Sequence, residues 1–226
     1  MVYGLQNMLS RNILKKSNLG GLEMRSFEFA RKVVNNEIVM EEDERGCFGE
    51  ALAFPDAQLP EYQTKHAAGA DFFCAKEVTI KPLWESVFSV FGSRLSNAVK
   101  CLAGKEVSDK EKDSIQSAFA PTKVHTGIKA NMEEDEVLEL YNRSSNPKKM
   151  GLVLANGVGV VDADYYNNPD NDGEIMFAFY NVLPWAVTLK VGDRIGQGVF
   201  KKYLRPTEGL RVKDVERTGG FGSTDK

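Results

Sequence analysis

Hydrophobic positions between Cys47 and about Leu204 fall in short runs that are rich in Val, Ile, Phe and Tyr. Turn-forming pairs such as Asn156-Gly157 and Gly192-Asp193 separate these runs. Short β-rich runs divided by turn signals are typical of strands, so the pattern predicts a mainly β domain, a barrel or jelly roll, over residues 46–204. The predicted strands are 78–81, 123–130, 137–141, 151–154, 157–161, 175–181, 187–191 and 195–203.

A helical period interrupts this pattern over residues 83–119. Apolar residues recur alternately four and three positions apart between Trp84 and Leu102, which is the spacing of an amphipathic helix. Ser108 and Glu111 then form a capping box ahead of a second helical segment. We expect a helical hairpin inserted between two strands, whose apolar stripe packs on the hairpin and the domain. The alternative is that the stripe binds another protein.

The two ends of the chain differ from its middle. Ser26 can cap a helix in which Phe27, Ala30 and Val34 share one face, so residues 1–45 are predicted to form a helical N-terminal extension. Residues 205–226 are glycine-rich and cannot build a core, which predicts a C-terminal arm.

Length and charge narrow the function classes. The 226 residues suit one large domain with additions, and a net charge of −3 disfavours nucleic-acid binding through phosphate neutralisation. No uncharged apolar run is long enough to span a membrane, and no secretory signal layout is present. Three scattered cysteines suit a reducing, cytoplasmic location and make a dedicated zinc site improbable.

Two segments carry candidate chemistry. The tail places Arg217 ahead of Gly219-Gly220-Phe221-Gly222-Ser223-Thr224, which could wrap a polyphosphate while the aromatic ring stacks on a base. The run from Gly159 to Tyr165 contains Asp162 and Asp164, which would share one face if the strand continued. These two carboxylates indicate either a general base or an ordinary turn at the end of a strand.

Five segments, taken together and in order, resemble the signature motifs of the homotrimeric dUTPase family. The resemblance covers roughly residues 50–82 and 120–226. The segments are Ala68–Asp71, Arg143–Ser145, Gly159–Tyr165, Gly192–Gln197 and Arg217–Thr224.

This resemblance implies a jelly-roll-like β barrel that forms a homotrimer with three shared active sites. The arm of one chain would close over a site on its neighbours. The implied reaction is the hydrolysis of dUTP to dUMP and pyrophosphate with Mg²⁺. Asp162 would activate the water that attacks the α-phosphorus, and Asp71 would meet the Mg²⁺ through water.

The resemblance also implies roles for the substrate-binding residues. Asn156 and the backbone of Gly159, Val160 and Val161 would read uracil, and Tyr165 would lie under the deoxyribose and exclude a 2′-hydroxyl. Phe221 would cover the base. Further substrate-binding residues implied by the resemblance are Arg143, Ser144, Ser145, Met176, Gln197, Arg217, Gly222, Ser223 and Thr224.

Some features depart from the family pattern. Ser145 stands where the motif commonly has glycine, and the loop from Tyr166 to Asp172 precedes Gly173-Glu174. Two other functions remain compatible with the sequence. A dCTP deaminase relative generally lacks the Phe-Gly-Ser-Thr arm, and a nucleotide-gated interaction protein would use the insertion at 83–119 to dock a partner.

Overall fold

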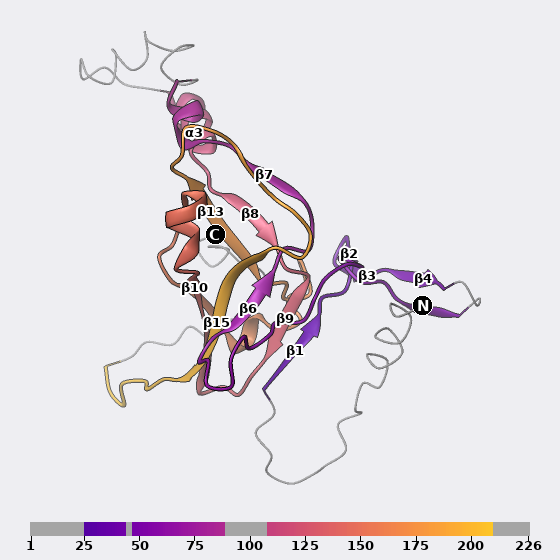
Figure 1. Ribbon diagram of the computed structural model, residues 1–226. Helices are drawn as coiled ribbons and strands as arrows, with labels where there is room; N and C mark the ends of the chain where they lie inside the picture. The colour runs from indigo at the N-terminus through magenta and orange to yellow at the C-terminus, as the bar shows by residue number, and fades with distance from the viewer. Residues whose placement is uncertain (1–24, 44–46, 89–107, 210–226) are drawn as a thin grey trace.

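The computed structural model describes residues 25–43, 47–88 and 108–209 (Figure 1). Their secondary structure is mainly β, which confirms this part of the predicted fold class. All eight predicted strands are present, although Gly127, with φ +66°, divides the run 123–130 into two. No helix in these ranges is long and apolar enough to cross a membrane.

A four-stranded antiparallel sheet forms one layer. Its order is β12 (Gly159–Asp162), β10 (Glu136–Asn142), β15 (Arg194–Lys202) and β6 (Ala70–Phe73). A three-stranded sheet has the order β11 (Leu152–Leu154), β13 (Met176–Asn181) and β8 (Thr122–His125).

Smaller elements complete the described chain. Four two-stranded sheets pair β1 (Ser26–Phe29) with β9 (Ile128–Asn131), β14 (Val187–Leu189) with β7 (Val78–Ile80), β2 (Val33–Val34) with β3 (Glu37–Ile38), and β4 (Met40–Glu42) with β5 (Phe48–Glu50). The helical elements are residues 83–88, α3 (Asp109–Ala118), a π-helical turn η1 (Asn146–Met150) and a 3-10 turn η2 (Ala163–Tyr165).

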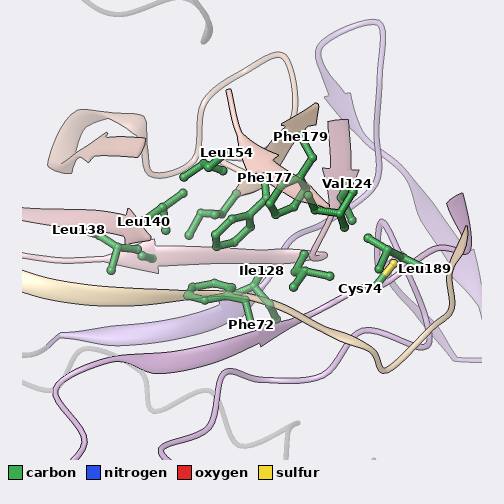
Figure 2. Packing of buried hydrophobic residues seen from close by; sticks show 14 of the residues in the cluster. Phe72, Cys74, Val124, Ile128, Leu138, Leu140, Leu154, Phe177, Phe179 and Leu189 are labelled. Carbon is green, nitrogen blue, oxygen red and sulfur yellow. The ribbon is translucent and has the colours of Figure 1, made fainter. Parts of the chain in front are cut away.

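The hydrophobic core lies between the four-stranded and three-stranded sheets (Figure 2). Phe72 of β6 and Leu138 of β10 face Phe177 of β13, and the rings of Phe72 and Phe177 are 5.6 Å apart between centroids. Each of these side chains is almost completely buried. Their burial holds the two sheets together, because large apolar side chains removed from water supply most of the stabilising free energy.

The prediction of a helical N-terminal extension is wrong for the described residues of that segment. Ser26–Phe29 is strand β1, in which Phe27 pairs with Ala130 and packs edge-on against Phe72 at 5.3 Å. Asn35 and Asn36, both with positive φ, form the two-residue turn between β2 and β3. This asparagine pair is a hairpin signal, and it outweighs the helical spacing of the apolar residues. Residues 1–24 lie outside the description.

The predicted helical insertion is only partly described. Residues 83–88 are helical, and α3 lies within the second predicted helix. The described residues show no helical hairpin, since the segment 89–107 that would complete it lies outside them.

Two glycines of β15 let the sheets approach closely. A Cβ at Gly196 would overlap the ring of Phe177, and one at Gly198 would lie 2.7 Å from Cε2 of Phe72. In a core packed at crystal-like density no space exists for either atom. The two phenylalanine rings therefore occupy the volume that β15 leaves free.

We predict that Gly196→Ala lowers the free energy of unfolding by about 1–3 kcal/mol, the usual effect of overpacking a core. Thermal and urea unfolding of the full chain would measure it. Gly49→Ala is the matched control, because Gly49 also lies in a strand and nothing surrounds its Cβ position within 4 Å. Equal stability of the two variants would contradict the packing assignment.

Candidate active site

Residues of three predicted motifs meet around Asp71, at one end of the four-stranded sheet. Asp71 of β6 lies opposite Gln197 of β15. Its Oδ2 is 3.2 Å from Nη1 of Arg194 and 3.9 Å from Nε of Arg143. Arg143 also donates from Nη1 to the carbonyl oxygen of Arg194 at 3.0 Å. The structure thus brings together Asp71, Arg143 and Gln197, which the motifs indicated, and adds Arg194.

The electrostatics of this cluster suit a polyanion. Two guanidinium groups face one carboxylate, so the local charge of these three groups is positive. Arg194 is exposed and Arg143 is half-buried, which leaves guanidinium donors accessible. Planar guanidinium groups bind phosphate oxygens in a two-pronged manner. This end of the sheet can therefore bind a phosphate chain.

Asp71 also decides how a metal ion could be held here. It is 8% exposed, and the described residues contain no group of three or more His, Cys, Asp or Glu side chains that could enclose a cation. One carboxylate fits a Mg²⁺ ion that keeps its waters and takes further ligands from phosphates. The donor set is thus compatible with the Mg²⁺ expected from sequence.

The turn that carries Arg143, Ser144 and Ser145 is fixed by Asn146. This side chain is fully buried and donates from Nδ2 to Oδ1 of Asn142 and to the carbonyl oxygen of Ile195, both at 2.7 Å. Ser145 has φ −78° and ψ −25°, an ordinary right-handed conformation. The backbone therefore accepts serine where the family motif commonly has glycine.

The second group of predicted residues lies on the hairpin β11–β12. Asn156 is exposed in the turn between these strands, and along β12 Gly159 is buried, Val160 exposed and Val161 half-buried. Asp162 is the exposed last residue of the strand, and Asp164 falls in η2. The strand therefore ends before it could bring the two aspartates onto one face.

Tyr165 is buried at the end of η2, 8% exposed. Its hydroxyl donates to the carbonyl oxygen of Glu174 at 3.0 Å and accepts from Nδ2 of Asn171 at 2.8 Å. Met176 begins β13 nearby in sequence, half-buried and opposite His125. The tyrosine is thus held by the loop that departs from the family pattern.

The two groups lie at different positions along the sheet. Asp71 is level with Gln197 and Tyr141, whereas Asp162 is level with Val137. Four residues of β10 separate these two levels, which is roughly 13 Å at ~3.3 Å per residue. One chain therefore presents an arginine-rich end around Asp71 and a separate hairpin end around Asp162.

Other predicted residues fall outside the described ranges. They are the residues of the glycine-rich arm, Arg217, Phe221, Gly222, Ser223 and Thr224.

Sequence reasoning did not identify the polar side chains that hold the Tyr165 loop. Asp172 is almost completely buried, and Oδ2 of this residue is 2.8 Å from Nζ of Lys129 and 2.9 Å from Nε of Arg31. Lys129 lies inside a predicted strand, where a charged residue between apolar neighbours was the available signal. Its partner could not be assigned from spacing alone.

The chain is similar to known proteins over most of its length. A family model described as dUTPase matches residues 101–225. The deoxyuridine 5′-triphosphate nucleotidohydrolase of Lactococcus lactis is 49% identical over 110 residues, which are 47% of this chain and 73% of that relative. The Wolinella succinogenes protein of the same name is 29% identical over 176 residues, covering 76% and 89% of the two chains. A solved dUTPase from Streptococcus mutans is 34% identical, with a TM-score of 0.49, and covers 69% of this chain and 96% of its own.

The chain belongs to the dUTPase family. Its activity is accordingly that of a dUTP diphosphatase, and its substrate is dUTP.

The acid sensitivity of the fold gives a test of the buried cluster. Burial by itself would raise the pKa of the Asp172 carboxyl, but hydrogen bonds from Arg31 and Lys129 bring this pKa below its usual value. A carboxyl with a lower pKa in the folded state stabilises the fold above its unfolded pKa of ~3.9, and this contribution is lost as the pH falls through the folded pKa.

We therefore predict that the Tm of the wild-type chain falls more steeply between about pH 5 and about pH 3 than the Tm of Asp172→Asn. Scanning calorimetry at stepped pH would compare the slopes. Asp170→Asn removes an exposed carboxylate of the same loop and should keep the wild-type slope. Parallel curves for wild type and Asp172→Asn would refute the assignment.

Proposed function

We propose that the chain acts as a homotrimer with shared active sites, each combining the Asp71 end of one subunit with the hairpin of another. The observation that carries this proposal is the separation along the sheet between Asp71 and Asp162. A triphosphate and the water that attacks it must meet within bonding distance, so two chains are needed to complete the site. Closed symmetry of three copies supplies such a contact three times.

Asp162 is proposed as the general base. Its exposed carboxylate at the end of β12 would take a proton from water while the water oxygen bonds to the α-phosphorus of dUTP. The bond from this phosphorus to the oxygen that bridges to the β-phosphorus breaks, and pyrophosphate leaves. The products are dUMP and pyrophosphate, and the proton from water is held by Asp162, so atoms and charge are conserved.

Positioning of the phosphates falls to the cluster around Asp71. Arg143 would bind phosphate oxygens with Ser144, Ser145 and Gln197, and Asp71 would hold Mg²⁺ through water. Bound Mg²⁺ would neutralise phosphate oxygens and favour an in-line arrangement. Preorganised positive charge of this kind usually contributes much of the rate enhancement in phosphoryl chemistry.

Base and sugar selection is proposed for the hairpin end. Asn156 and the backbone of Gly159, Val160 and Val161 would pair with the polar edge of uracil, where mismatched donors are strongly penalised. Tyr165 would close the space at the 2′ position of the sugar, and Met176 would add an apolar contact.

The C-terminal arm, 205–226, is proposed to close over this site. Phe221 would stack on the base, and Arg217, Gly222, Ser223 and Thr224 would cover the phosphates and exclude water. We further propose a cytoplasmic location, which is consistent with the free cysteines Cys47 and Cys74 among the described residues.

A docking role for the insertion at 83–119 is a second candidate function. Trp84 is 50% exposed and Phe88 is 72% exposed, and both line a hollow with Pro82 and Pro184. Exposed aromatic side chains gathered in one place are typical of protein-binding surfaces.

Asp162→Asn keeps the shape of the side chain and removes the proton acceptor. We expect kcat for dUTP to fall by about a hundredfold to ten-thousandfold while binding of a non-hydrolysable dUTP analogue is kept. Pyrophosphate release and calorimetric titration would measure the two quantities. Asp164→Asn, two residues further along, is the control and should keep wild-type turnover. An unchanged kcat in Asp162→Asn would exclude this residue as the base.

Mixing two inactive variants tests the sharing of sites between subunits. One variant lacks residues 217–226, and the other is Asp162→Asn. Each should have little activity and should sediment as a trimer, which for the point variant is about 75 kDa, three copies of 25.1 kDa. After subunit exchange, some sites would combine an intact Asp162 with an intact arm from another chain, so activity should return. Exchange without any recovery would refute the cross-subunit assignment.

A further inference from the structure

Asp172 fixes the loop between η2 and β13 to the N-terminal part of the fold. Its Oδ2 accepts hydrogen bonds from the backbone N–H and from Nε of Arg31 at 2.8 and 2.9 Å, and its Oδ1 is 2.5 Å from Nη2 of Arg31. Lys129 of β9 donates to Oδ2 at 2.8 Å. Asp172 is 2% exposed, so this arrangement is shielded from water. Charge-assisted hydrogen bonds in such a setting define the position of a backbone closely.

A second connection ties the same loop to β1. The hydroxyl of Tyr166 donates to Oε2 of Glu28 at 2.7 Å, and Nζ of Lys129 lies 4.9 Å from the centre of the Tyr166 ring. The residue that follows Tyr165 in the chain is thus held by Glu28 of β1 and by Lys129, a contact that it shares with Asp172.

The loop turns back onto the backbone of Tyr165. Asp172 and Gly173 have φ of +57° and +79°, and a Cβ at Gly173 would lie only 2.6 Å from the carbonyl oxygen of Tyr165. Asn168 donates its N–H to this same oxygen at 3.2 Å and accepts from the N–H of Asp172 at 2.7 Å. A left-handed aspartate persists only where surrounding contacts determine it, and the ion pair with Arg31 provides them.

Asn171 carries the restraint to the ring of Tyr165. Its Nδ2 donates to the Tyr165 hydroxyl at 2.8 Å and to the carbonyl oxygen of Glu174 at 3.2 Å. The Tyr165 hydroxyl in turn donates to that carbonyl at 3.0 Å. The side chain is consequently held at its hydroxyl by Asn171 and Glu174, and at its backbone by the folded loop.

We propose that Asn171 and the Arg31–Asp172 pair are positioning residues that fix the Tyr165 ring and so set how strongly the enzyme prefers dUTP to UTP. This inference rests on the proposed place of Tyr165 beneath the deoxyribose. A ring that is fixed at both ends cannot tilt aside for a 2′-hydroxyl, whereas a loosely held ring can. Exclusion of a small group depends on how rigidly its neighbours are supported.

The ratio of kcat/KM for dUTP to kcat/KM for UTP tests this proposal on the full chain. Asn171→Ala and Arg31→Gln should each lower the ratio about tenfold, the effect expected for losing one or two hydrogen bonds of the support. Tyr165→Phe, which keeps the ring and removes the hydroxyl, should lower it similarly, and Tyr165→Ala should lower it further.

Two matched controls should keep the wild-type ratio. Asp170→Asn changes an exposed side chain of the same loop, and Lys32→Gln breaks the exposed pair of Lys32 with Glu41 beside Arg31. A merely structural role would reduce the active fraction, which lowers the rates for both substrates equally and leaves the ratio unchanged. Asn171 is only half-buried, so its variant decides the question if Arg31→Gln does not fold.

The outcomes distinguish the positioning role of Asn171 and Arg31 from the role of Tyr165 itself. If Tyr165→Ala changes the ratio while Asn171→Ala and Tyr165→Phe do not, the positioning role is refuted and the role of Tyr165 stands. If Tyr165→Ala leaves the ratio unchanged, Tyr165 does not select the sugar, and the inference falls with it.

Discussion

The pairing of β15 with both β6 and β10 is the constraint on which the remaining structure depends. In this register Gly196 lies opposite Phe72, and Gln197 lies opposite Asp71. Side chains alternate between the two faces of a sheet, so Phe72 points into the core while Asp71 and Gln197 share the opposite face. A shift by one residue would exchange these faces, placing a carboxylate in the core. Packing of the core therefore selects the same register that places Asp71 beside Gln197.

The sequence predicted the strands of the central domain well, because their β-branched and aromatic runs are separated by strong turn signals. It failed between residues 26 and 42, where Phe27, Ala30 and Val34 fit a helical period equally well. Tertiary contacts favour strands there, since Phe27 packs on Phe72 and Phe200 across the fold. A local pattern of apolar residues contains no information about a packing partner that lies far along the chain.

The sequence indicated candidate residues for the site but did not indicate how they are arranged in space. The order of the motifs indicated Asp71, Arg143, Asp162 and Gln197, because their chemistry is carried by short contiguous segments. The distance between Asp71 and Asp162 follows from strand register, which depends on how β10 pairs with two neighbours at once. Arg194 joined the site for the same reason, since its bond to Asp71 is made across strands.

Charged side chains around Asp172 hold the loop, and burying charges requires free energy for their desolvation. Burying Lys129 and Asp172 carries a desolvation penalty, which the hydrogen bonds from Arg31 and Lys129 outweigh for the Asp172 carboxyl, whose pKa is lowered. Well-packed apolar side chains often stabilise a fold as well. Apolar contacts, however, are non-directional and would tolerate several loop positions. The directional hydrogen bonds from Arg31 and Lys129 favour one position, in which Asp172 adopts a left-handed conformation and Asn171 reaches the Tyr165 hydroxyl. Beside its contribution to stability, the cluster defines the geometry of this loop and connects the N-terminal strands to the residue proposed to select the sugar.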